Sequence, residues 1–141
     1  TSGTTNMQPF PAQRPVEGVG SVGTVTIILP TTTTLTVTVV NTGSGNKYYV
    51  DGVQQATLTL NEGSTYKFDQ SAGTNGGHPL RLSITSDGTH SGGSEYTTGV
   101  TTNGIPGNAG AYTQIVVATG APTLYYYCTI HSGMGGQANT P

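Results

Sequence analysis

Alternation of hydrophobic and polar positions is the clearest pattern along this chain of 141 residues. In residues 33–40, TTLTVTVV, the aliphatic side chains of Leu35, Val37 and Val39 alternate with threonines. A period of two places these three side chains on one face of a β-strand, and β-branched residues favour that conformation. The pattern predicts a half-buried strand over 33–40, and the β-branched run 24–29, TVTIIL, predicts another strand before Pro30.

Further strand-like runs follow, and turn residues separate them. An Asp51-Gly52 pair within residues 47–60 is a typical two-residue hairpin turn, and the Asn-Glu-Gly sequence at 61–63 divides residues 57–69 into two strands. No segment has a clear helical period. The remaining strands are expected over residues 78–84, 111–118 and 123–128, with a long loop over 85–110. About eight short strands in all predict an all-β sandwich or barrel.

The first 23 residues differ from the rest because they contain three prolines, several Gly and Ser, and no hydrophobic period. This composition is typical of an extended arm or linker. We therefore divide the chain into an N-terminal arm, residues 1–23, and one β domain, residues 24–141. The arm is expected to dock on the domain or on a neighbouring chain.

Charged residues make up only 7% of the chain, against roughly 25% in an average globular protein, and the formal net charge is −2. Residues 18–46 and 96–141 contain no Asp, Glu, Lys or Arg. This distribution excludes a basic nucleic-acid surface, and it excludes a strong steering field from those segments. No window is long and apolar enough for a membrane span. A neutral surface rich in Thr, Gly and Asn is more typical of an exported or virion protein than of a cytosolic one.

Candidate chemistry lies near the C-terminus, in YYYCTIHSGMGG at residues 125–136, where Cys128, His131 and Met134 stand three residues apart. A helix would place them on one face, but the three tyrosines favour a strand and the glycines disfavour a helix. Alternate tyrosine rings of that strand are expected to face the core and the solvent. We expect the strand to end at Cys128 and a tight loop to return His131 and Met134 to the same point.

Thiolate, imidazole and thioether together favour a soft or borderline metal, and one Cys, two His and a weak Met ligand form a blue-copper site. The second imidazole comes from His78 or His90. His78 opens a hydrophobic strand that would hold it rigidly, whereas His90 lies in a Ser/Gly loop and is expected to be solvated. We therefore predict the ligand set His78, Cys128, His131 and Met134. Taken singly, each residue could instead be an ordinary buried or hydrogen-bonded side chain.

These segments resemble the cupredoxin (type 1 copper) family. The Cys-x2-His-x2-Met loop and the His 50 residues before the Cys match the family's ligand pattern, and ATLTLNEGSTYKFDQ resembles the segment before the first His. The resemblance covers residues 47–136, and GHPLRLS, SDGTHSGGSEYTTGV and LYYYCTIHSGMGG are most similar to cupredoxin-like modules in structural proteins of marine phages and in marine bacteria. It implies a Greek-key cupredoxin-like β-sandwich that binds one copper ion through His78, Cys128, His131 and Met134.

One position departs from the family pattern. The residue after the first His is usually an Asn whose backbone N–H donates to the Cys sulfur, but here it is Pro79, which has no N–H. Hydrogen bonds to the ligands tune a metal centre. The departure therefore implies either a more electron-rich thiolate with a lower copper potential, or a site that has drifted from electron transfer.

The sequence favours a structural role over catalysis. Its acidic residues are scattered, and it carries neither a Ser nucleophile motif nor a phosphate-binding loop, so we do not expect an enzyme. We expect a structural or surface module of a virion or extracellular assembly that contacts copies of itself, or other virion or surface proteins, through its arm. The alternative is a soluble type 1 copper electron carrier, which would be periplasmic and would use His131 as its electron port.

Overall fold

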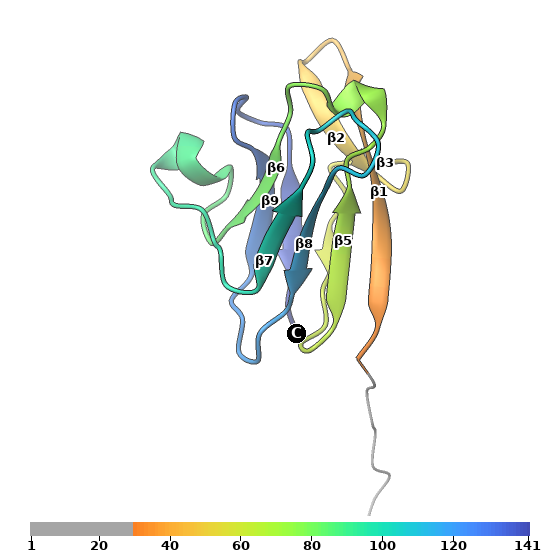
Figure 1. Cartoon of the computed structure of the whole chain (residues 1–141). Helices are drawn as coiled ribbons and strands as arrows, with labels where there is room; N and C mark the ends of the chain where they lie inside the picture. The colour runs from red at the N-terminus through yellow and green to blue at the C-terminus, as the bar shows by residue number, and fades with distance from the viewer. Residues whose placement is uncertain (1–29) are drawn as a thin grey trace, which may run out of the picture.

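The computed structural model describes residues 30–141, and most of the regular structure in this part is β-strand (Figure 1). Its strands form two sheets, and two short 3-10 turns, η1 (Gly73–Asn75) and η2 (Gly88–Ser91), lie between strands. The six-stranded sheet has the order β3-β2-β1-β5-β8-β7 and contains β1 (Thr32–Asn41), β2 (Asn46–Val50), β3 (Val53–Gln54), β5 (Thr65–Asp69), β7 (Val100–Asn103) and β8 (Tyr112–Val116). The four-stranded sheet has the order β4-β10-β9-β6 and contains β4 (Leu58–Thr59), β6 (Leu80–Ser83), β9 (Leu124–Cys128) and β10 (Gly136–Asn139). The predicted all-β sandwich is confirmed.

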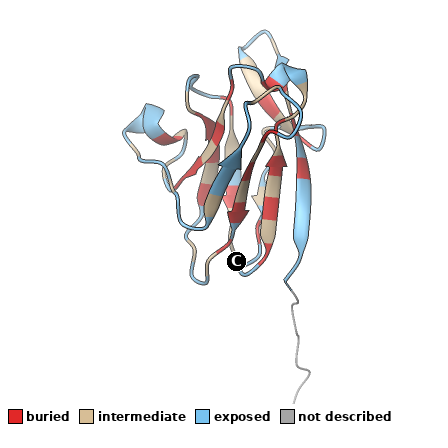
Figure 2. Ribbon diagram, viewed as in Figure 1, coloured by how far each residue is buried: buried red, intermediate tan, exposed pale blue. Residues whose placement is uncertain are grey.

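One apolar core lies between the two sheets, and buried positions alternate along β1, β2, β5 and β8 (Figure 2). Tyr48 of β2, Phe68 of β5 and Tyr126 of β9 are among its largest side chains. The Tyr126 ring centroid lies 6.3 Å from that of Tyr48 and 6.0 Å from that of Phe68. Tilted rings at these separations attract each other in addition to the gain from burial. Because β9 belongs to the other sheet, these contacts join the two layers at the strand that ends in Cys128.

Strand β1 confirms the predicted alternation, since Leu35, Val37 and Val39 are buried and the threonines between them are not. Its first half pairs in parallel with β5 and its second half pairs antiparallel with β2. The predicted hairpin is also present, because β2 and β3 pair across Asp51 and Gly52. Their φ values of 49° and 81° are those of the type I′ turn that an Asp-Gly pair favours.

Several element boundaries differ from the prediction. The stretch 85–110 is more than a loop, because it contains η2 and also β7, which pairs with β8. The expected strand 78–84 is shorter, since β6 begins at Leu80, after Pro79, and the chain leaves the sheet after Ser83. Ile84 is consequently 59% exposed instead of continuing the buried face. Strand β10 was not expected at all, because its sequence GQAN has no hydrophobic alternation.

The predicted arm, residues 1–23, and the predicted strand 24–29 lie outside the described residues. Within residues 30–141, no helix has the length and apolar character needed to cross a membrane. The Greek-key connection implied by the family resemblance stays a prediction.

Candidate metal centre

Three donor side chains meet where strand β9 ends. Cys128 is the last residue of β9, His131 lies in the following loop, 129–135, and His78 lies two residues before β6, which pairs with β9. Their ligand atoms all lie within 4.8 Å of one another. The Sγ atom of Cys128 is 3.8 Å from His78 Nδ1 and 3.6 Å from His131 Nδ1. Both imidazoles thus turn the same nitrogen toward the sulfur, so the three donors can share one ion.

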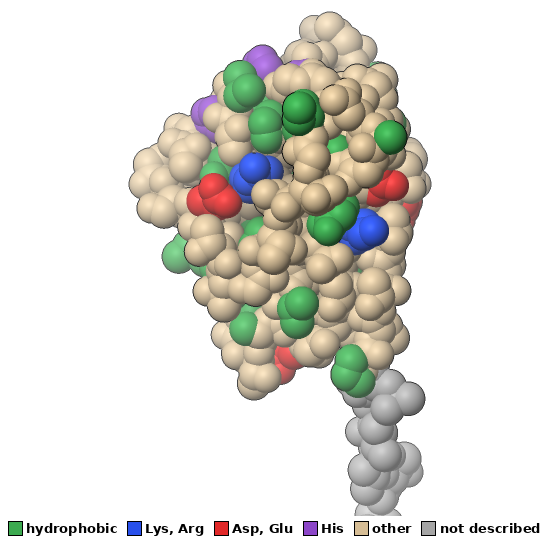
Figure 3. All heavy atoms as spheres, in the orientation of Figure 1, with side chains coloured by type: hydrophobic (Ala, Val, Ile, Leu, Met, Phe, Trp, Pro, Cys, Tyr) green, Lys and Arg blue, Asp and Glu red, His purple; other side chains and the backbone are tan. Residues whose placement is uncertain are grey.

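Burial differs sharply among the donors. Cys128 is fully buried and His78 is 9% exposed, whereas His131 is exposed. Met134 is buried nearby and, together with His131, lines a surface cavity of about 490 Å³. Figure 3 shows histidine side chains at the upper end of the molecule and few charged side chains over the rest of that face. A metal ion held by these donors would have a shielded thiolate and one imidazole edge at the surface.

Backbone hydrogen bonds hold His78 in place. Its carbonyl oxygen accepts from the Tyr48 hydroxyl at 2.6 Å and from the Gln70 side-chain amide at 2.7 Å, and its N–H donates to the Asn75 carbonyl at 2.8 Å. The Gln70 amide also donates to the Asn75 side chain at 3.1 Å and accepts the Leu80 N–H at 2.9 Å. Gln70 therefore hydrogen-bonds to the backbone of His78 and of Leu80, on both sides of Pro79.

The environment of His78 favours the protonation state that binds metal. Burial lowers the pKa of His78 below its ordinary value, and the neighbouring His131 lowers it further because two imidazolium charges repel each other. A neutral imidazole keeps a lone pair free for a metal ion. Burial also raises the pKa of Tyr48, with a smaller contribution from Cys128, so the Tyr48 hydroxyl stays protonated and keeps donating to His78.

The β2–β3 hairpin holds one flank of the loop 129–135. The backbone N–H of Tyr48 donates to the Met134 carbonyl at 2.9 Å, which fixes the backbone of the residue that carries the thioether. The Lys47 ammonium group donates to the Gly133 carbonyl at 2.9 Å, and the Gln55 amide donates to the same oxygen at 3.2 Å. The loop is therefore attached to the six-stranded sheet although it continues β9 of the other sheet.

His90 is exposed, as expected for a solvated loop residue, but its ring also contacts the strand that ends in Cys128. His90 lies in η2, and its Nε2 atom is 2.7 Å from the carbonyl oxygen of Cys128. Because a carbonyl oxygen only accepts, Nε2 carries the proton in this contact. The ring also packs edge-on against Tyr127, with 6.2 Å between centroids and 86° between planes. The structure thus brings His78 to the sulfur of Cys128 and His90 to its backbone.

The predicted alternation of the tyrosines along β9 holds for the two faces of the strand but not for the solvent exposure of the second face. Tyr126 faces the core and Tyr125 is half-buried, but Tyr127, on the other face of the strand, is only 1% exposed. The η2 segment covers its ring so closely that a Cβ atom on Gly88 would lie 2.6 Å from it. Part of the stretch expected to be loop therefore shields the second face of the strand that ends in Cys128.

The donor set fits the metal that the resemblance implies. A thiolate, two imidazoles and a thioether suit copper, whereas Mg²⁺ and Ca²⁺ prefer oxygen ligands. The residues that support the site were not predicted. They are Gln70 and Asn75 behind His78, Lys47 and Gln55 beside the loop, His90, and Asp87, whose carboxylate accepts the Gly133 N–H. The only local signal was the Asp-Gly pair at 87–88, which is equally typical of an ordinary turn.

None of the known family models matches this chain, and no curated protein matches it significantly. Membership of the cupredoxin family therefore stays a prediction, and the ligand pattern and the geometry of the donors are its support.

Proposed function

We propose that this chain is a cupredoxin-like domain that binds one copper ion through His78, Cys128, His131 and Met134. The observation that carries the proposal is the convergence of three donor atoms within 4.8 Å, with Met134 buried nearby. Soft sulfur ligands combined with imidazoles match a type 1 copper site. Copper bound there would supply one-electron redox chemistry. The residues of the chain contribute a neutral imidazole at His78, a sulfur shielded from water and an exposed imidazole at His131.

The role we propose for this domain is that of a structural or surface module in a virion or extracellular assembly. Residues 18–46 and 96–141 carry no charged side chain, so copies or partners could pack against them without charge repulsion. The predicted arm, residues 1–23, would add a strand to a neighbour's sheet edge. A metal ion that binds only the folded chain would stabilise the module.

A soluble electron carrier is the second candidate, and the exposure of His131 favours it. The Cys128 sulfur is buried, so the His131 ring is the part of the donor cluster that a redox partner can approach. The nearly uncharged surface weighs against fast, steered encounters with such a partner.

Titration of the full chain with Cu(II) tests the metal proposal. We expect uptake of one ion per chain and an intense thiolate-to-copper absorption band in the red. Cys128→Ser is expected to abolish the colour because it removes the sulfur, whereas His90→Ala is expected to keep it because His90 reaches only the carbonyl oxygen of Cys128. Colour that survives in Cys128→Ser, or is absent from His90→Ala even at saturating Cu(II), would contradict the proposed ligand set.

Two further measurements separate the proposed roles. Small-angle scattering of the full chain is expected to show self-association that grows with concentration if the domain is an assembly module, and a monomer at high concentration would count against that role. Voltammetry of the copper-loaded chain is expected to show a reversible one-electron couple if the domain is an electron carrier. A copper ion that cannot be cycled reversibly would remove the second candidate.

A further inference from the structure

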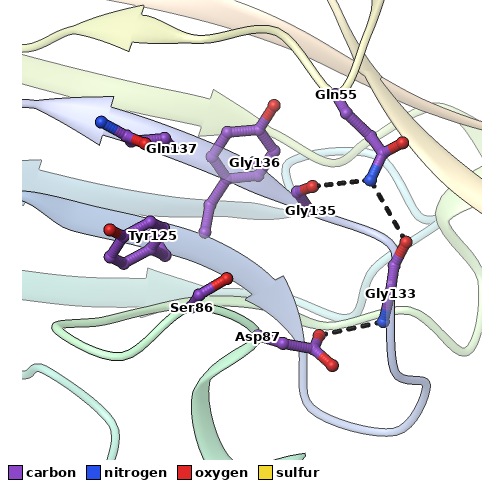
Figure 4. A pocket seen from close by; sticks show the side chains of 9 residues that line it. Gln55, Ser86, Asp87, Tyr125, Gly133, Gly135, Gly136 and Gln137 are labelled. Atoms are coloured by element: carbon purple, nitrogen blue, oxygen red, sulfur yellow. Dashed lines mark hydrogen bonds between the residues drawn. The ribbon is translucent and has the colours of Figure 1, made fainter. Parts of the chain in front are cut away.

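The loop 129–135 has a second support, which reaches it from the flank opposite the β2–β3 hairpin. The carboxylate of Asp87 accepts the Gly133 N–H at 2.9 Å and also accepts the Ser132 hydroxyl. Figure 4 shows Asp87 and Gln55 approaching Gly133 from two sides, beside a cavity of about 290 Å³. Gly133 is thus fixed at its N–H by Asp87 and at its carbonyl by Gln55, although both partners are distant in sequence.

The turn that contains Asp87 also holds the beginning of the loop. His90, three residues further on, bonds the Cys128 carbonyl oxygen at 2.7 Å. Asp87 and Gly88 both have left-handed φ values, 61° and 54°, and this conformation brings Gly88 against the Tyr127 ring. A left-handed backbone at a residue other than Gly is uncommon and persists where its surroundings hold it. The turn is therefore fixed on β9 and can act as a rigid support.

We propose that Asp87 and His90 are positioning residues of the metal centre, which hold the loop 129–135 in its metal-binding shape before an ion arrives. The inference rests on the proposed copper-binding function. Together they fix the backbone on both sides of His131 and directly before Met134. Ordering a free loop costs conformational entropy, and a loop that is already ordered removes this cost from the binding step. Neither side chain touches the ion.

The test compares Asp87→Ala with a matched control, Glu62→Ala, in the full chain. Glu62 makes the same kind of contact, since its carboxylate accepts the Gly120 N–H at 2.7 Å between two loops. Gly120 lies in the β8–β9 connection, before β9, whereas the metal centre follows the end of that strand. The control therefore removes a comparable hydrogen bond without touching the loop 129–135.

Two backbone amides that neither Asp87 nor His90 touches report on the loop in the metal-free protein. The Tyr48 N–H bonds to the Met134 carbonyl, and the Thr129 N–H bonds to the Pro79 carbonyl. Hydrogen exchange at these amides measures how often the loop opens. The rate of copper release to a chelator, followed by the loss of colour, measures the same support in the loaded protein.

Asp87→Ala is expected to raise exchange at the Tyr48 amide about tenfold or more, because a hydrogen bond to a charged acceptor is lost, and to speed copper release by a similar factor. His90→Ala is expected to have its larger effect at Thr129. The conservative variants Asp87→Asn and His90→Gln keep an acceptor and a donor, respectively, and are expected to retain most of the protection. Glu62→Ala is expected to leave exchange and release near the wild-type rates.

Unchanged exchange at both amides in Asp87→Ala and His90→Ala would overturn the inference. Equal acceleration by Glu62→Ala would overturn it too, because the effect would then be general loosening of the fold. If Asp87→Ala does not fold, Asp87→Asn replaces it in the test. Wild-type rates of amide exchange and of copper release in Asp87→Asn support the role of the acceptor, whereas tenfold faster exchange in this variant contradicts that role. If the wild-type chain takes up no copper, the proposed function fails, and exchange in the metal-free protein alone decides the inference.

Discussion

At the scale of the residue, the amide of Gln70 replaces backbone hydrogen bonds that the chain around Pro79 lacks. Pro79 has no N–H, and the Leu80 N–H donates to Gln70 Oε1 instead of to a neighbouring strand. The NH2 group of the same amide reaches the His78 carbonyl. Gln70 is 1% exposed, so water could not easily replace these contacts. The position of His78 therefore depends on this buried side chain as well as on its contacts with Tyr48 and Asn75.

We expect Gln70→Leu to lower the free energy of unfolding of the metal-free protein by about 2 kcal/mol, because it leaves the buried Leu80 N–H without its acceptor. Urea denaturation measures the change. The control is Gln54→Leu, an exposed position in β3, where an effect within about 0.5 kcal/mol is expected. Equal losses in the two variants would show that the contacts of Gln70 contribute little.

The donors could be predicted from the sequence, and their supports could not. Cys128, His131 and Met134 fall within seven residues, so a short sequence pattern identifies them. The remaining ligand required only a choice between two other histidines of the chain. The structure brings His78, Cys128 and His131 together. The contact from Asp87 to Gly133 joins residues 46 positions apart, and no local pattern marks such a pair.

At the scale of the element, the η2 segment packs most closely on β9 at Gly88. Gly88 lies against the Tyr127 ring, and a Cβ atom there would be 2.6 Å from three ring carbons. Glycine is required here for two reasons: a side chain would clash with the Tyr127 ring, and φ is positive at this residue. Asp87 and His90 flank this contact, so the placement of both depends on it.

Gly88→Ala is therefore expected to cost about 1–3 kcal/mol more than Gly92→Ala in the free energy of unfolding, because only Gly88 meets a neighbouring ring. Gly92 has a similar positive φ, 81°, but a Cβ atom there would enter open space. Urea denaturation of the two variants gives the difference. Equal losses would mean that the η2 segment is not closely packed on β9.

Asp69, the last residue of strand β5, is expected to lower the free energy of unfolding when it is protonated in acid. The Asp69 carboxylate accepts hydrogen bonds from the side chain of Ser71 and, with a smaller effect, from its backbone N–H. Both hold the pKa of Asp69 below its ordinary value. The folded state therefore binds this proton less readily than the unfolded state, so the contribution is present above the ordinary pKa of about 3.8 and disappears as the pH falls through the lowered value. Urea denaturation of wild-type protein and Asp69→Asn is expected to show a larger difference at neutral pH than in strong acid. A difference that is constant with pH would contradict this.

Elements with a buried face could be predicted, and short polar elements could not. The alternation in β1 reproduces the buried face that the structure shows, and the Asp51-Gly52 pair marks the hairpin. Strands β7 and β10, with the sequences VTTN and GQAN, contain almost no hydrophobic side chain. They form because β8 and β9 offer edges to pair with, which is a property of the assembled sheet.

At the scale of the whole molecule, both sheets contribute residues to the candidate metal centre. Cys128 and the loop 129–135 continue β9 of the four-stranded sheet, while Lys47, Tyr48 and Gln55 reach the loop from the β2–β3 hairpin of the other sheet. The centre exists only when both sheets are packed. Binding of a metal ion is therefore expected to stabilise the whole sandwich and not the loop alone.

Free copper at a hundredfold excess over its dissociation constant is expected to raise the free energy of unfolding by about 2.7 kcal/mol. Urea denaturation with and without copper measures the increase. Cys128→Ser is the control and is expected to show a much smaller one. The same increase in both proteins would show that copper stabilises the chain from some other site.

X-ray absorption at the copper edge of the loaded full chain reports the atoms that surround the ion, so it tests whether Cys128, His78 and His131 bind copper. We expect one short copper–sulfur distance from the Cys128 thiolate and the scattering of two imidazoles, and we expect the short sulfur distance to be absent from Cys128→Ser. A spectrum of wild-type protein with nitrogen and oxygen neighbours alone would show that Cys128 is not a copper ligand.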